Sequence, residues 1–109
     1  MVKKRIPQKI EERIKEYIDI LRNDDLPIKK VVLFGSYAKG SQHKWSDVDI
    51  AIVSPKFTNH FEALHYLNHK TKNREPYYLE PHGLTPDDFK DKYNSLAQEI
   101  EKHGIELNI

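Results

Sequence analysis

Residues 31–53 read VVLFGSYAKGSQHKWSDVDIAIV, and this stretch decides the fold. Its two ends, residues 31–34 and 50–53, are short apolar runs rich in β-branched residues, which is typical of strands that are buried on both faces. A Gly-Ser pair leaves the first run, and two aspartates one residue apart open the second. We therefore expect two buried strands joined by a polar connection that carries the chemistry of the protein.

The surrounding sequence supplies helices and a third strand. Apolar residues at spacings of three and four predict a helix over residues 7–22, and a second helix is expected over 59–72. Residues 77–80 are a strand candidate, and the alternating residues 105–109 could add a last short strand or dock loosely. This order of elements predicts an α/β (α+β) fold, in which helices flank a small mixed sheet.

The last predicted helix runs from Thr85 to about His103. Threonine is a good cap, Pro86 fits the first helical position, and Asp88 stands where a capping box needs an acid. The apolar stripe of this helix comprises Phe89, Tyr93, Leu96, Ala97 and Ile100.

Composition sets further bounds. The chain has 109 residues, so we expect one domain over residues 1–109. Its net charge of +1 lacks the basic excess of a duplex-binding domain, and no direct contact with nucleic acid is expected. Cysteine is absent, and no apolar run is long enough for a membrane helix or a leader. A soluble, cytoplasmic protein is therefore expected.

The two aspartates predict a site for a divalent metal. Side chains alternate faces along a strand, so Asp47 and Asp49 should point the same way. Two neighbouring carboxylates repel each other, and a cation between them relieves that repulsion. Mg²⁺ is the expected ion, because it takes oxygen ligands from one or two carboxylates and from substrate phosphates.

The Gly-Ser turn predicts a phosphate-binding element. Gly35 permits a tight turn and a close approach of backbone N–H groups to an anion. Ser36 adds a hydroxyl and could open a short helix, and Lys39 could neutralise phosphate charge. Either half alone could be an ordinary turn or an ordinary strand start. Their combination in one short window favours the functional interpretation.

A third carboxylate should complete a two-metal site. Glu80 is the best candidate because it ends a predicted strand, and Glu75 is the alternative, although it precedes a proline. His82 could face the same side as Glu80 if the strand continues past Pro81.

These residues resemble a known family. Gly-Ser, then Ala-x-Gly, then Ser-Asp-x-Asp before a hydrophobic strand is similar to the signature of the nucleotidyltransferase superfamily related to DNA polymerase beta. The small size resembles its minimal branch, the MNT proteins, which are often paired with a HEPN-domain toxin. The resemblance implies that Gly35, Ser36, Lys39 and Ser46 hold the nucleotide. It also implies that Asp47, Asp49 and Glu80 are the metal-binding catalytic carboxylates, with glutamate replacing the usual aspartate at the third position.

The resemblance implies two functions. In the first, two Mg²⁺ ions lie about 3.5–4 Å apart and assist transfer of AMP from ATP to an acceptor hydroxyl. The chain has no room for an acceptor domain, so the acceptor would stand on a partner, such as a HEPN toxin, and the protein would act as an antitoxin. In the second, the chain is a non-catalytic antitoxin that neutralises a HEPN ribonuclease by direct contact. A homodimer is the other expected assembly.

Overall fold

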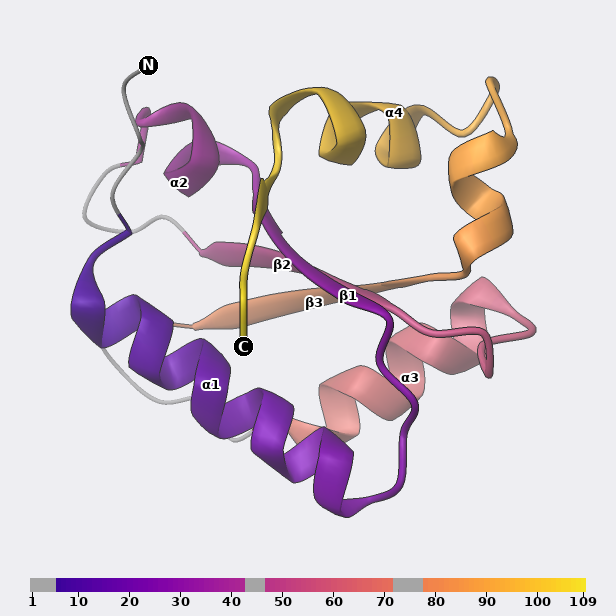
Figure 1. Cartoon of the computed structure of the whole chain (residues 1–109), viewed down its shortest axis with the longest axis horizontal. Coiled ribbons are helices and arrows are strands. Elements are labelled where there is room, and N and C mark those ends of the chain that lie inside the picture. Colours follow the sequence, from indigo (N-terminus) through magenta and orange to yellow (C-terminus); the bar gives the residue numbers. More distant parts are fainter. Residues whose placement is uncertain (1–5, 43–46, 72–77) are drawn as a thin grey trace.

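The computed structural model describes residues 6–42, 47–71 and 78–109 of the chain. Four strands form one sheet, and helices lie on both of its faces (Figure 1). In chain order the elements are α1 (Gln8–Asn23), β1 (Lys30–Phe34), α2 (Ser36–Lys39), β2 (Val48–Val53), α3 (His60–Lys70), β3 (Leu79–Leu84), the 3-10 helix η1 (Pro86–Lys90), α4 (Ser95–His103) and β4 (Ile105–Glu106).

The sheet is mixed, as the sequence predicted. Its strand order is β3-β2-β1-β4, so β2 and β1 are central. Strand β1 pairs antiparallel with both β2 and β4, whereas β2 and β3 are parallel. A parallel pair needs a crossover connection, and α3 supplies it between β2 and β3.

Apolar side chains on the two faces of the sheet form two separate cores. The odd-numbered residues of β1 and the even-numbered residues of β2 pack with α1 and with Leu67 of α3. The opposite face, which carries Val32, Phe34 and Ala51, packs against Ala97 and Ile100 of α4. Because side chains alternate along a strand, Asp49 shares this second face with Ala51.

Two helix and two strand predictions are confirmed within a few residues. Helix α1 presents its predicted stripe to the core: Ile10, Ile14, Ile18 and Leu21 are buried. Helix α3 begins where Asn59 caps it, with Asn59 Oδ1 accepting the backbone N–H of Phe61 at 2.8 Å. Strand β2 starts at Val48, before the predicted residue 50, so that Asp49 lies inside the strand.

The third strand was predicted too early in the chain. Strand β3 runs over Leu79–Leu84 and continues through Pro81. A proline is tolerated there because β3 is an edge strand. Val48 N–H donates to Tyr78 O and Ser54 N–H to Leu84 O, so the even-numbered residues of β3 bond to β2 and the backbone of Pro81 faces outward.

The prediction of one continuous helix from Thr85 to His103 is wrong. The capping box is present, with Thr85 N–H donating to Asp88 Oδ2 at 2.7 Å, but it starts only the short helix η1. Asp91 Oδ1 then accepts from Tyr93 N–H, and Asn94 Oδ1 caps a new helix at Ala97 N–H. These two turn-forming side chains interrupt the helix between Lys90 and Ser95, and Tyr93 in the interruption is 83% exposed.

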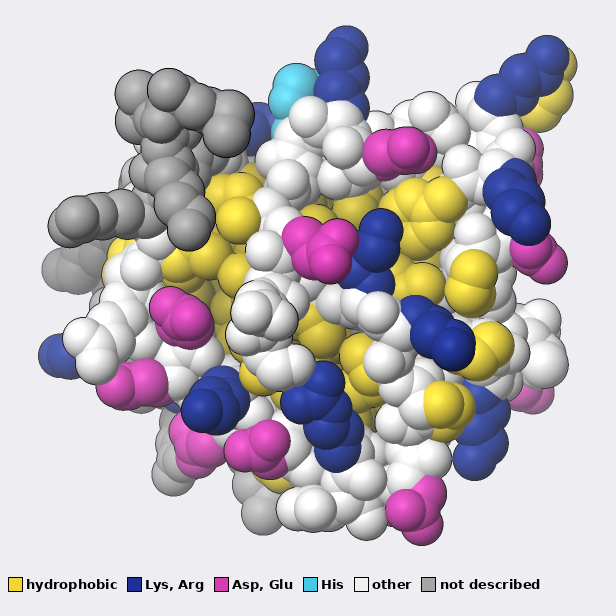
Figure 2. All heavy atoms as spheres, viewed as in Figure 1, with side chains coloured by type: hydrophobic (Ala, Val, Ile, Leu, Met, Phe, Trp, Pro, Cys, Tyr) yellow, Lys and Arg dark blue, Asp and Glu magenta, His cyan; other side chains and the backbone are white. Residues whose placement is uncertain are grey.

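The end of the chain adds a strand, one of the two outcomes expected from its alternating pattern. Strand β4 pairs with Val32 and Leu33 of β1, and Arg22 Nη2 donates to Ile109 O at 2.7 Å. Among the described residues, no helix combines the length and the apolar character that crossing a bilayer requires. On the face shown in Figure 2, acidic and basic side chains are interspersed, and neither sign of charge gathers into one patch.

Candidate metal and nucleotide site

The parallel pairing of β2 with β3 brings the predicted acidic residues together. In this register Asp49 lies opposite Glu80, and Ala51 lies opposite His82. All three titratable side chains are on the face of the sheet that α4 covers, near the end of the sheet where β2 begins. The separation of 31 positions along the chain between Asp49 and Glu80 is therefore closed by strand pairing alone.

Asp49, Glu80 and His82 form one cluster. Each offers one ligand atom, and these atoms all lie within 4.8 Å of one another. His82 Nε2 is 3.6 Å from Asp49 Oδ1 and 3.8 Å from Glu80 Oε1. Asp49 and His82 are largely buried, whereas 52% of the Glu80 side chain is exposed, so the cluster opens to solvent on the Glu80 side.

The electrostatics of the cluster favour a cation. Burial raises the pKa of the Glu80 carboxyl above its ordinary value, and the charge of Asp49 raises this pKa further. His82 opposes the shift, while Asp47 adds to it. A carboxylate whose ionisation is disfavoured by a neighbouring carboxylate is the arrangement that a divalent ion stabilises.

Asp47 stands slightly apart from the cluster. It precedes β2 by one residue and is exposed. Its charge acts on Glu80, so it lies at the same end of the sheet. Among the described residues, the group whose ligand atoms come together includes His82 and not Asp47. The three predicted carboxylates are thus neighbours, and their role as ligands stays a prediction.

Gly35 lies against Asp49. It follows Phe34, the register partner of Asp49, and has φ +73° and ψ −150°, a conformation that favours glycine. A Cβ at Gly35 would collide with Asp49 Oδ2 and would lie 3.1 Å from Asp49 Cγ. The missing side chain therefore lets the Gly-Ser turn approach the acidic cluster.

The rest of the predicted nucleotide element is only partly described. Ser36 begins α2, as expected from the sequence, and is half-buried. Lys39 at the end of α2 forms an ion pair with Glu99 of α4, with Nζ and Oε1 2.5 Å apart. Ser46 and the alternative carboxylate Glu75 lie outside the described residues.

His82 is the residue that sequence reasoning left undecided. The signal was present, because His82 stands two positions after Glu80, but Pro81 made the continuation of the strand uncertain. The strand does continue, and the His82 ring lies edge-on to Phe34 with ring centroids 5.0 Å apart. Its Nε2 is buried and has no hydrogen-bond partner among the described residues.

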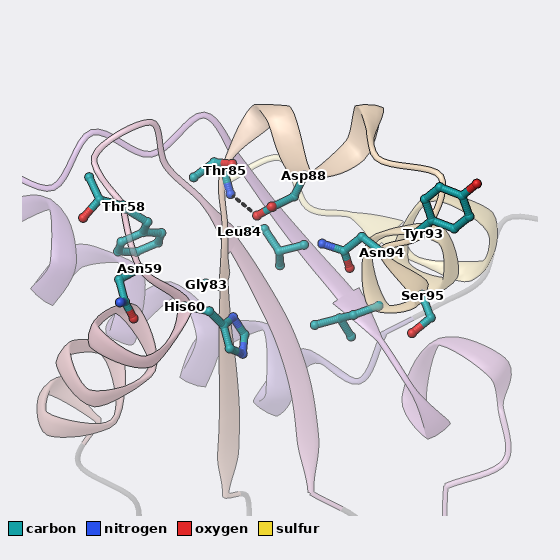
Figure 3. Close-up of a pocket in the computed structure, with 12 residues that line it drawn as sticks. Thr58, Asn59, His60, Gly83, Leu84, Thr85, Asp88, Tyr93, Asn94 and Ser95 are labelled. Carbon is teal, nitrogen blue, oxygen red and sulfur yellow. Dashed lines mark hydrogen bonds between the residues drawn. The ribbon is translucent and has the colours of Figure 1, made fainter.

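A separate cavity of about 470 Å³ lies at the other end of β3. Figure 3 shows Asn59 and His60 on one side of this cavity and Asn94 and Ser95 on the other, with Leu84 between them. Asp49, Glu80 and His82 do not line it. The cavity is therefore separate from the acidic cluster.

A family profile described as "Nucleotidyltransferase domain" matches residues 14–107. The match covers β1, the Gly-Ser turn, β2 and β3, which together build the acidic cluster. The chain belongs to the nucleotidyltransferase domain family.

Curated relatives are similar over part of the chain. A Methanocaldococcus jannaschii protein, provisionally named protein adenylyltransferase MJ1379, is 36% identical over 63 residues, which are 53% of this chain and 62% of that protein. The protein adenylyltransferase MntA of Shewanella oneidensis is 43% identical over 37 residues, 34% of this chain and 27% of that protein. The aligned part therefore spans less than two thirds of each of these relatives.

Solved structures share the fold. A crystal structure of the toxin-antitoxin pair MntA-HpeT superposes with a TM-score of 0.60 and 26% identity, over 86% of this chain and 70% of that chain. A toxin-antitoxin structure with AMP-PNP gives a TM-score of 0.53 and 25% identity, over 88% and 70% of the two chains. A nucleotidyltransferase-like protein of Sulfolobus solfataricus gives 0.62 at 19% identity, over 97% and 87%, which shows the fold alone.

Proposed function

We propose that this chain is a protein adenylyltransferase that moves AMP from ATP to a hydroxyl group of a partner protein. The observation that carries the proposal is the placement of Asp49 opposite Glu80, beside the Gly35 turn, inside the region that matches the nucleotidyltransferase family. The partner we propose is a HEPN-domain toxin, which the modification would silence, so that the chain acts as an antitoxin. Similarity to the MntA proteins supports this direction.

The residues present fit a divalent metal. Two carboxylates and an imidazole converge, and the pKa of Glu80 is raised by burial and by its neighbour Asp49. The buried nitrogen of His82 has no hydrogen-bond partner in residues 6–42, 47–71 and 78–109. Asp49 and Glu80 would hold the ion, with Asp47 at the exposed side of the site. Mg²⁺ bound there would neutralise charge on the attacking and leaving oxygens of the transfer.

The chain's own residues position the nucleotide and the acceptor. Gly35 lets backbone N–H groups and the Ser36 hydroxyl approach the phosphates without a side chain in the way. If Lys39 leaves its ion pair with Glu99, its ammonium group would pair with the phosphates and neutralise part of their charge. In the transfer, the acceptor oxygen forms a bond to the α-phosphorus as the bond to pyrophosphate breaks, and the acceptor hydroxyl releases its proton. Holding both reactants in line supplies much of the rate enhancement.

The test uses ATP labelled on the α-phosphate, a divalent ion, and the partner that copurifies on co-expression. We expect label on the partner and a mass increase of one AMP. Asp49→Asn should abolish labelling, whereas Asp87→Asn, an exposed change on η1 away from the cluster, should preserve it. A stable complex that protects cells from the toxin without any mass change on the partner would favour the non-catalytic antitoxin instead.

A further inference from the structure

The acidic cluster contains a nitrogen atom that a carboxylate-only magnesium site does not need. Within the part of the chain that the structure describes, His82 Nε2 is buried without a hydrogen-bond partner. It faces Asp49 Oδ1 and Glu80 Oε1 at 3.6 and 3.8 Å. Both distances exceed those of a hydrogen bond. Buried polar atoms are nearly always satisfied, so an orphaned ring nitrogen between two carboxylates needs an explanation.

The ring of His82 is held in this orientation by the fold. His82 lies in β3 opposite Ala51 of β2. Phe34 of β1 packs edge-on against the imidazole, with an interplanar angle of 64°. The neighbouring strands thus fix the ring, and Nε2 can present a lone pair when the proton is on Nδ1.

We propose that His82 is a protein ligand of the metal site formed with Asp49 and Glu80, and that its nitrogen makes this site select Mn²⁺ over Mg²⁺. Mg²⁺ prefers oxygen ligands and near-ideal octahedral geometry. Carboxylate oxygen suits both Mg²⁺ and Mn²⁺, whereas imidazole nitrogen suits the transition ions of the series that Mn²⁺ begins. Mn²⁺ therefore shares the oxygen ligands of Mg²⁺ and, as a transition ion, accepts a nitrogen more readily. The inference rests on the proposed function, because it assigns a ligand to the same site.

Another role for His82 is that of a cation paired with the two carboxylates. In that arrangement the imidazolium itself balances the charge of Asp49 and Glu80, and its removal leaves them repelling each other. The two roles differ in what they predict for the bound ion. A ligand contributes a directly coordinated nitrogen, whereas a paired imidazolium is displaced when a metal binds.

The experiment uses the full chain and Mn²⁺ as a spin probe. Pulsed electron paramagnetic resonance of bound Mn²⁺ detects a coordinated ¹⁴N, and we expect this coupling in the wild-type protein. Loss of the free Mn²⁺ signal gives its affinity, and competition gives the affinity for Mg²⁺. His82→Gln should remove the coupling and reduce the Mn²⁺/Mg²⁺ selectivity by about tenfold or more. His65→Gln, an exposed change on α3, is the matched control and should alter neither.

Each outcome decides something. The inference is overturned if Mn²⁺ binds the wild type without nitrogen coupling, or if wild type and His82→Gln have equal Mn²⁺/Mg²⁺ selectivity. Neither result contradicts the proposed function if AMP transfer persists. Nitrogen coupling that is lost in His82→Gln, without AMP transfer to any partner, supports the inference and counts against the proposed function. If neither ion binds the wild type, both fail. The wild-type spectrum needs no variant, and urea unfolding of His82→Gln checks that it folds.

Discussion

The carboxylate of Asp49 occupies the space that a side chain at position 35 would need, so Gly35 and Asp49 pack directly against each other. Gly35 also has φ +73° with an extended ψ of −150°, where residues other than glycine are strained. The turn that is expected to hold phosphate and the carboxylate that is expected to hold metal are therefore a single packing unit. A change in either should disturb the other.

Gly35→Ala should cost stability and remove metal binding. The added methyl group collides with Asp49 Oδ2, and the backbone strain alone costs about 1–3 kcal/mol. Gly40→Ala is the control, because Gly40 has the same φ of +73°, with a left-handed ψ of 17°, and no atom of a described residue lies within 4 Å of an added Cβ. Urea unfolding and Mn²⁺ binding measure both effects. Equal losses of metal affinity in the two variants would show that the collision with Asp49 is unimportant.

Glu80→Gln should stabilise the metal-free protein near neutral pH. Burial and Asp49 raise the pKa of Glu80, so its contribution to stability is present below the unfolded-state pKa and is lost as pH rises through the folded-state pKa. Half of the side chain is exposed and solvent screens the repulsion, so the gain should be below about 1 kcal/mol.

The measurement for Glu80→Gln is the melting temperature relative to wild type between pH 4 and pH 7. The difference should be positive at pH 7 and should shrink toward zero at about pH 4, below the ordinary glutamate pKa of about 4.3. Addition of Mn²⁺ should reverse the order, because the wild type gains more from the ion. A variant that is less stable than wild type at pH 7 without metal would contradict the repulsion.

Lys39→Met should weaken ATP binding, and Glu99→Gln should not. In the structure Glu99 accepts a hydrogen bond from Lys39, which lowers the pKa of Glu99 together with the lysine charge. If Lys39 turns to phosphate, it must leave Glu99, so removal of the Glu99 charge should leave ATP affinity unchanged or raise it. Calorimetric titration with ATP measures this, with Lys90→Met as a control for general loss of positive charge. A lower affinity of Glu99→Gln for ATP would instead indicate that the ion pair between Lys39 and Glu99 holds α2 in position for nucleotide binding.

Tyr17→Phe should destabilise the fold without affecting the site. The buried Tyr17 hydroxyl donates to Leu67 O at 2.8 Å and connects α1 with α3. Its loss removes a buried hydrogen bond, which costs about 0.5–1.5 kcal/mol. Tyr93→Phe, at a side chain that is 83% exposed, should have no measurable effect on the urea midpoint. Equal midpoints for the two variants would contradict the role of the buried hydrogen bond.

The sequence predicted most of the fold because its apolar patterns are strong. The residues of the α1 stripe and of the β-branched runs in β1 and β2 are buried. Apolar residues at regular spacings in the sequence indicate such buried positions. The break between η1 and α4 was missed because the stripe from Phe89 to Ile100 continues in register across it. The decision there falls to the side chains of Asp91 and Asn94, whose local hydrogen bonds outweigh the periodic pattern.

The acidic residues of the candidate site could be named from the sequence, whereas the position of His82 beside them could not be decided. Asp47 and Asp49 are separated by a single residue in the sequence, and Glu80 was predicted from the need for a third carboxylate. Placing His82 beside them requires the parallel register of β2 and β3, which depends on the crossover through α3 and on a proline being accepted within a strand. Both depend on how the whole sheet is assembled, and the local sequence around Glu80 and His82 does not reveal that.

Pro81 has a consequence for how any partner can engage this chain. Pro81 has no backbone N–H to donate at the exposed edge of β3. A strand from another protein that paired with this edge would therefore lack a hydrogen-bond donor in the middle of β3. An associating protein is thereby steered away from extending the sheet past β3 and, on that side of the molecule, toward contacts with side chains. A binding surface of that kind can change its preference through point substitutions while the scaffold beneath it stays the same.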